Sequence, residues 1–201
     1  MARHSELPPK PGRPRSTEAD RTILEATLKL LGKRGYTNMS IDQVASEAGV
    51  SRATVYRRYR DKADLVTQAV ASRYGSEEVP NTGSAYSDLL ELLSQGRTKH
   101  EGEAGMSLVG VLLVEGPHDS ELLESSRERI ILPRRRRYRL VLKRGMRRGE
   151  VRSQADVEAV IDALSGAYYA RHLSGLPLDE GWAERVLREV WLPLRVETSD
   201  Q

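Results

Sequence analysis

Residues 52–57 carry the side chains whose types and spacing best suit a chemical role. In a helix that begins after Ser51, positions 52, 53, 56 and 57 share one outward face, and position 54 lies on its flank. An arginine can hydrogen-bond guanine, the methyl groups of alanine and threonine can contact thymine, and a tyrosine hydroxyl can bind phosphate. The pattern therefore predicts a contact with the major groove of double-stranded DNA through Arg52, Ala53, Thr54, Tyr56 and Arg57.

Two short helices and a turn position this face. Ser40 with Gln43 three residues later forms a capping box for the first helix, and Gly49 is placed to end it in the left-handed conformation. Ser51 then caps the second helix, in which Val55 and Tyr59 are four residues apart and are expected to pack inward. This order of caps, turn and inward pair is typical of a helix-turn-helix.

The neighbouring charges fit the same interpretation. Lys62 opens the next helix, where backbone N–H groups also favour phosphate. Residues 1–75 have a net charge of +6, residues 76–201 have −3, and the 201-residue chain has +3. We expect residues 1–16 to form a flexible basic arm, because four prolines block a helix. The alternatives are a solvated helix face and an arm without a role.

The rest of the chain shows helical periodicity. No segment has the sustained alternation of apolar and polar residues that would predict a strand. The expected fold class is all-α with about nine helices, and Pro133 should kink or restart the longest one. Glycines and a proline in residues 75–84 predict a boundary between a DNA-binding domain at 17–74 and a second domain at 84–195. The expected helices are 17–35, 41–48, 51–59, 61–74, 84–97, 103–115, 119–147, 155–173 and 179–192.

Several function classes lack the residues that they need. The chain has no cysteine, and its four histidines show no metal-ligand spacing, so we expect no metal site and no cofactor. Phosphate-binding glycine motifs and a nucleophile elbow are absent, which argues against an enzyme. No apolar run is long enough for a membrane span and no secretory signal is present, so a cytoplasmic protein is expected.

Residues 15–72 resemble the tetracycline-repressor (TetR) family of bacterial regulators. The resemblance lies in the order and spacing of residues 22–26, 31–41, 45–51, 55–59 and 62–65, with Tyr59 where the family commonly has Phe. It implies a three-helix DNA-binding domain, a helical ligand-binding and dimerisation domain, and repression from a palindromic operator that a small molecule relieves. By position it implies base contacts from Arg52 and Ala53 and phosphate contacts from Thr54, Tyr56, Arg57 and Lys62. It also places Ser40 at the DNA, as the cap of the helix that crosses the backbone, and implies that the arm with Arg13 and Arg15 can enter the minor groove.

The resemblance also implies a homodimer formed by the last two long helices. The apolar residues expected at that interface are Ile161, Leu164, Tyr168, Trp182, Val186, Leu187, Val190 and Trp191. The expected lining of an effector pocket is Leu89, Leu93, Met106, Val109, Leu113, Tyr138, Leu142, Met146 and Tyr169. For both groups of residues the alternative interpretation is that they form the ordinary hydrophobic core of a single chain.

Two further questions stay open at this level. Residues 134–148 hold nine Arg or Lys and no acid, which fits either a solvated face with ion pairs or a contact with an anionic effector or with DNA. A DNA-binding protein controlled by a partner protein, or one that activates transcription, has the same N-terminal signals. A small-molecule ligand in the C-terminal core would separate these possibilities.

Overall fold

The computed structural model describes residues 17–74, 78–100, 106–114 and 119–196, and these are almost entirely helical. Within those ranges there is no β-strand, only an isolated antiparallel bridge between Val151 and Arg195, so the all-α prediction is confirmed. The helices are α1 (Thr17–Asn38), α2 (Ile41–Glu47), α3 (Arg52–Tyr56), α4 (Lys62–Tyr74), α5 (Ala85–His100), α6 (Ser107–Val114), α7 (Ser120–Ser126), η1 (Arg127–Ile131), α8 (Leu132–Arg147), α9 (Val157–Leu173) and α10 (Trp182–Trp191).

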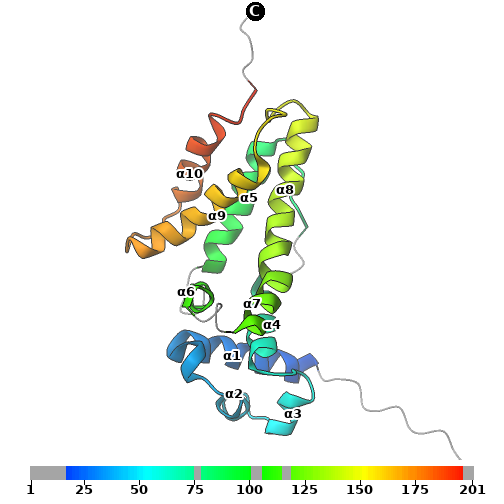
Figure 1. Cartoon of the computed structure of the whole chain (residues 1–201), viewed down its shortest axis with the longest axis vertical. Coiled ribbons are helices and arrows are strands. Elements are labelled where there is room, and N and C mark those ends of the chain that lie inside the picture. Colours follow the sequence, from blue (N-terminus) through cyan, green and yellow to red (C-terminus); the bar gives the residue numbers. More distant parts are fainter. Residues whose placement is uncertain (1–16, 75–77, 101–105, 115–118, 197–201) are drawn as a thin grey trace, which may run out of the picture.

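The molecule is elongated, with α1 to α4 at one end and α5, α8, α9 and α10 at the other (Figure 1). Helices α6 and α7 lie between these two groups. The helix-turn-helix therefore occupies one extremity, where α2 and α3 face away from the rest of the chain.

The local signals for α2 and α3 are reproduced in detail. Ser40 Oγ accepts from Gln43 N at 3.3 Å while the Gln43 side chain accepts from Ser40 N at 3.0 Å, which completes the capping box. Gly49 has φ +66°, a conformation that side-chain-bearing residues rarely adopt, and it ends α2 as expected. Val55 and Tyr59 are buried in the same cluster as Val44. Helix α3 is shorter than predicted and has Arg57 as its C-cap, although Tyr59 N still donates to Val55 O at 3.0 Å beyond it.

The predicted helix 119–147 is interrupted, as Pro133 suggested, but the break lies on its N-terminal side. The segment η1 is a π-helical turn in which Leu132 N donates to Arg127 O, five residues earlier. Pro133 then stands in the first turn of α8, where its missing N–H leaves no bond of α8 unmade. The described residues thus form ten α-helices and one π-helical turn, because one predicted helix becomes α7 and α8.

Two hydrophobic clusters stabilise the chain. The first joins α1, α2, α3 and α4 and also includes Leu122 of α7 and Ile130 of η1. The second joins α5, α8, α9 and α10, with Tyr168 and Trp182 in ring contact at 4.6 Å between centroids. The side chains of α6 that pack inward, Val111 and Leu112, contact the first cluster. The helices α6 and α7 and the turn η1 therefore pack with the first cluster.

None of the helices in the described ranges is long and apolar enough to cross a membrane.

Candidate functional site

A hollow of about 330 Å³ on the outer face of α2 and α3 brings together four of the predicted DNA-binding residues. Three elements supply these residues: Ser40 precedes α2, Arg52 and Tyr56 belong to α3, and Lys62 begins α4. Tyr56 is 45% exposed. The other lining residues are Met39, Ile41 and Asp42.

Arg52 is held in place by a residue that the sequence pattern did not indicate. Its Nε lies 3.0 Å from Asp42 Oδ1 and its Nη1 donates to Asp42 Oδ2 at 3.2 Å. The guanidinium of Arg52 in α3 and the carboxylate of Asp42 in α2 therefore form a bidentate ion pair. Nη2 also donates to Tyr56 Oη at 3.4 Å. This bond to Tyr56 and the charge of Asp42 raise the pKa of Arg52 further. Arg52 is therefore charged and oriented while still exposed.

Lys62 is positioned by the end of α1. Its Nζ lies 4.3 Å from the centroid of the Tyr36 ring and donates to Thr37 O at 3.4 Å. The ammonium group is thus kept at the rim of the hollow beside the first turn of α4, where a phosphate oxygen would also meet backbone N–H groups.

The remaining residues of the recognition segment divide into exposed and structural positions. Ala53 and Arg57 are exposed, and Thr54 is half-buried with its hydroxyl 2.8 Å from Ser51 Oγ. Arg58, next to them, has a side chain that is only 8% exposed, and it donates to Asp20 Oδ1 of α1 at 2.8 Å, which ties the end of α3 to α1. Arg13 and Arg15 lie outside the described residues, so their contacts with DNA stay a prediction.

A second feature is a cavity of about 380 Å³ between the two hydrophobic clusters. Three residues of the predicted effector pocket, Val109, Leu113 and Tyr169, are in its wall. Met106 is not among the lining residues. The full lining is Val70, Val109, Leu112, Leu113, Leu123, Ile130, Ile131, Arg134, Arg135, Asp162, Ser165, Gly166 and Tyr169.

The other residues expected in the pocket lie elsewhere. Leu89, Leu93, Tyr138 and Leu142 are buried in the second cluster, and Met146 packs against it. The reason is that α5 and α8 contact each other directly, so the side chains between them fill the core and leave no space for a ligand. The actual cavity lies nearer to the DNA-binding end, and Leu123, Ile130 and Val70 were not predicted for it.

The residues expected at a dimer interface are mostly core residues of their own chain. Ile161, Leu164, Tyr168, Trp182 and Leu187 are buried in the second cluster, because α9 and α10 turn their large apolar side chains toward α5 and α8. Val186, Val190 and Trp191 are only partly buried, and the Trp191 ring meets Tyr86 edge-on at 5.5 Å. The outward face of α9 instead exposes small side chains, with Ala159, Ala163 and Ala170 in one stripe.

The described residues contain no group of three or more His, Asp or Glu that could hold a metal ion. These residues form an exposed hollow with two cations at one end of the molecule and a partly open cavity at its centre.

Comparisons with known proteins agree on one family. Residues 23–69 match the model of the bacterial regulatory proteins of the tetR family, and residues 79–190 match a tetracyclin repressor-like C-terminal domain. The HTH-type transcriptional regulator YdeS of Bacillus subtilis is 33% identical over 82% of this chain and 83% of its own length. The DNA-binding transcriptional repressor TetR of Mycobacteroides abscessus is 29% identical over 86% and 91%.

The fold comparison leads to the same result. The crystal structure of the TetR family transcription regulator SCO0332 superimposes with a TM-score of 0.63 and 25% identity, over 87% of this chain and 97% of that one. Both family models, the relatives and the fold therefore converge, and they do so over both ends of the molecule. The chain is a helix-turn-helix transcriptional regulator and belongs to the TetR family.

Proposed function

We propose that this regulator represses transcription by binding a palindromic operator as a homodimer, and that a small molecule in the central cavity releases it. The DNA-binding unit in this proposal is residues 17–74, preceded by the arm at 1–16, and the effector-binding and dimerisation unit is 84–195. The site of action is the bacterial cytoplasm, where the operator is accessible.

The observation that carries the proposal is the grouping of Ser40, Arg52, Tyr56 and Lys62 around one exposed hollow. The first residue of α3 is Arg52, and recognition helices approach base edges with their N-terminal residues. Tyr56 and Lys62 lie on the rim, where hydroxyl and ammonium groups suit phosphate oxygens. One short helix can thus combine a base-reading group with groups that fix its position on the duplex.

Dimerisation is supported by the outer face of α9. Its exposed residues Ala159, Ala163 and Ala170 leave room for a second helix to approach. Two copies joined along α9 would place two recognition helices on one duplex under two-fold symmetry. A symmetric protein reading two half-sites prefers a palindrome.

Release by a ligand is supported by the position of the cavity. Its wall includes Val70 of α4, the helix that follows the helix-turn-helix, together with residues of α6, η1 and α9. A molecule in this cavity contacts α4 of the DNA-binding unit and α9 of the second unit. It releases DNA only if it binds more tightly to the conformation in which the recognition helices are wrongly spaced.

Selection of bound DNA from a random library, with the full chain at one fixed salt concentration, tests the first part of the proposal. We expect enrichment of a palindrome, and cross-linked or light-scattering masses that show two chains per duplex. Equal retention of all sequences would contradict a sequence-specific regulator, and an enriched site without symmetry would contradict the dimer.

A further inference from the structure

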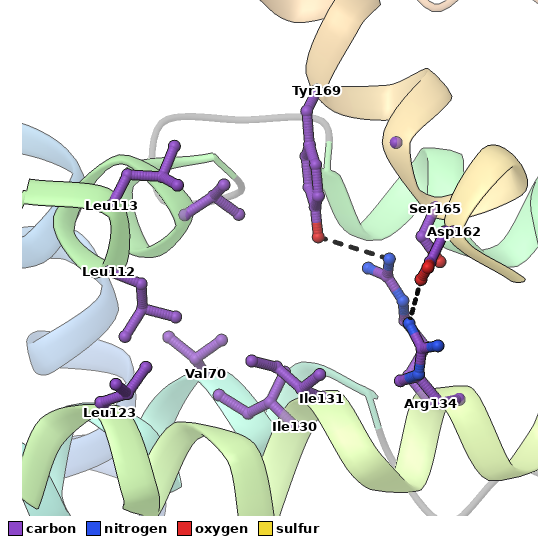
Figure 2. A pocket seen from close by; sticks show the side chains of 13 residues that line it. Val70, Leu112, Leu113, Leu123, Ile130, Ile131, Arg134, Asp162, Ser165 and Tyr169 are labelled. Atoms are coloured by element: carbon purple, nitrogen blue, oxygen red, sulfur yellow. Dashed lines mark hydrogen bonds and ion pairs between the residues drawn. The ribbon is translucent and has the colours of Figure 1, made fainter. Parts of the chain in front are cut away.

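One wall of the central cavity consists of aliphatic side chains. Figure 2 shows Leu112, Leu123 and Ile130 on this wall, which comes from α4, α6, α7 and η1. Two further members, Leu113 and Ile131, are 72% and 36% exposed, so the wall leaves large apolar side chains in contact with water. A molecule that covers them removes apolar surface from water, which favours an apolar occupant.

The charged pair on the opposite wall is already neutralised within the chain. Arg135 donates to Asp162 and, at 2.6 Å, to Glu158. Arg139 donates to the other oxygen of Glu158 at 2.7 Å. Hydrogen bonds from Arg139 and Arg135 lower the pKa of Glu158 to about 2, so this acid is ionised at neutral pH and keeps both arginines paired. A charged ligand would have to displace one of these bonds.

Arg134, the other cation in the wall, is held by aromatic side chains. Its Nη2 donates to Tyr169 Oη at 3.4 Å, and its guanidinium carbon lies 5.9 Å from the ring centroids of both Tyr168 and Tyr169. Attraction between a cation and the face of an aromatic ring stabilises this arrangement. A charged group of either sign would therefore enter a wall whose charges have partners, and burying it there without a partner of its own costs free energy.

Gly166 leaves the α9 side of the cavity open. The residue lies within α9 and lines the cavity. A methyl group at this position would meet no atom within 4 Å beyond its own stretch of helix, so there is free space beside the backbone. An occupant can therefore extend from the aliphatic wall to the backbone of α9 without meeting a charged side chain at this point.

We propose that the cavity binds a neutral, largely aliphatic molecule. Its body packs on the wall of valine, leucine and isoleucine side chains and reaches Gly166, while the arginines of the opposite wall keep their partners within the chain. The inference rests on the proposed function, since it names the chemical class of the releasing molecule. It also favours the interpretation of the basic run 134–148 as a face with ion pairs, because Arg135, Arg139 and Arg148 all pair with acids of this chain.

The cavity size is compatible with this class. A volume of about 380 Å³ is at the lower end of the range for small-molecule sites, which run from about 300 to 1,000 Å³. A single medium-length aliphatic body suits it better than a large cofactor. Suitable probes are the neutral alcohol decanol, the anion decanoate and the cation decylammonium, which share one apolar body and differ in the head.

Calorimetric titration of the full chain without DNA at neutral pH tests the proposal. We expect decanol to bind about tenfold or more tightly than either ion, because a charged head loses its hydration and gains no free partner. Tighter binding of decanoate would show an anionic ligand, and tighter binding of decylammonium a cationic one. Either result, three equal affinities or no binding of any probe would overturn the proposal.

A side chain added at Gly166 tests the place of binding. Gly166→Leu puts an aliphatic side chain into the space of the ligand and should weaken decanol binding by about tenfold or more. Gly110→Leu is the matched control, because Gly110 lies in α6, also has no atom within 4 Å of an added methyl group, and does not line the cavity. Both variants should keep the melting temperature or raise it, since glycine is unfavourable inside a helix. Full binding in Gly166→Leu would overturn the site.

A second pair of variants tests the aliphatic wall and does not depend on the glycines. Ile131 and Leu140 are each 36% exposed, but only Ile131 lines the cavity. Ile131→Ala should weaken decanol binding by about fivefold because it removes apolar contact, and Leu140→Ala should leave it unchanged. Equal effects in the two variants would remove this wall from the site. None of these readouts involves DNA, so their failure is distinct from failure of operator binding.

Discussion

Arg129 of the π-helical turn η1 binds the buried carboxylate of Asp64 in α4, with Arg129 Nη1 2.6 Å from Asp64 Oδ1. The same nitrogen donates to Thr67 Oγ1 at 3.0 Å. The next two residues, Ile130 and Ile131, line the cavity. The turn therefore contacts the central cavity on one side and α4, the last helix of residues 17–74, on the other. Turns of π-helix are often found at functional positions.

Replacing Arg129 should weaken this connection. Arg129→Met removes the shorter of the two ion pairs of the buried Asp64 and leaves the one to Arg60 Nη2 at 3.7 Å. We expect the free energy of unfolding to fall by about 1–3 kcal/mol. The effect of a bound ligand on operator affinity should shrink as well. The control is Arg127→Met in the same turn, because the pair of Arg127 with Glu124 is exposed and should contribute less than about 1 kcal/mol. Equal losses in the two variants would show that Arg129 has no special role.

Asp64 also predicts how stability depends on pH. Burial alone would raise the pKa of Asp64, but hydrogen bonds from Arg60 N, Gln68 and Arg129 outweigh it and hold the pKa below its usual value. The native carboxyl therefore binds a proton less readily than the unfolded one. The ionised carboxyl of Asp64 therefore adds its full share to the free energy of unfolding above the unfolded-state pKa of about 3.9. This share is lost as the pH falls through the lower pKa of the native state.

Asp64→Asn should accordingly flatten the acid side of the stability curve. Urea unfolding of parent and variant between neutral pH and about pH 3 would measure it, because the acid loss of paired carboxylates begins near pH 5. The variant should be less stable than the parent at neutral pH, and the difference should narrow in acid. A difference that stays constant over the whole range would contradict a depressed pKa at this residue.

The sequence predicted the features of this protein that depend on neighbouring residues. The capping box of Ser40, the turn at Gly49 and the inward Val55 each follow from local geometry, so their positions were predictable. The pairs Arg52–Asp42 and Arg129–Asp64 join different helices, and no spacing rule indicates them. Leu89 and Tyr138 were predicted for the effector pocket but lie in the core. Sequence spacing cannot separate the two, because apolar residues at helical spacing occur both in a core and in the wall of a cavity.

The recognition helix should separate base reading from phosphate binding. Arg52→Ala should lower the ratio of operator to random-DNA affinity, at about 1–3 kcal/mol for the base that it reads. Lys62→Ala and Tyr56→Phe should weaken both affinities and nearly keep the ratio. Competition binding at fixed salt measures both, with Arg188→Ala as a control that removes an exposed cation from α10. A ratio that survives Arg52→Ala but collapses in Lys62→Ala would reverse the assignment.

The dimer proposal is tested best on the exposed face of α9. Ala163 is exposed in the single chain, so Ala163→Arg should leave the melting temperature of the fold unchanged. At a dimer interface the added charge would be buried against the second chain, and light scattering should then report monomers. Trp191 is less suitable, because its contact with Tyr86 makes any change there a change in the core. Ser87→Arg, on the exposed side of α5, provides the control that should leave the mass unchanged. A dimer that persists in Ala163→Arg would exclude this face.

The basic arm should be visible in the salt dependence of DNA binding. Removal of residues 1–15 deletes Arg13 and Arg15, and the slope of log K against log salt should flatten by about 0.9 for each phosphate contact that is lost. Titrations of the full and shortened chains at several salt concentrations would show it. Identical affinities and slopes would mean that the arm does not touch DNA.

The membership of the first hydrophobic cluster has a consequence for how such regulators can be recombined. Leu122 and Ile130 belong to the core around α1 to α4, although more than forty residues separate them from the end of α4. A chimaera that takes only the first 74 residues would leave these two side chains facing a foreign surface. A graft that also carries α6 (Ser107–Val114) and residues 119–131 would keep the contacts of this cluster, so the transferable module of this protein is discontinuous in the chain.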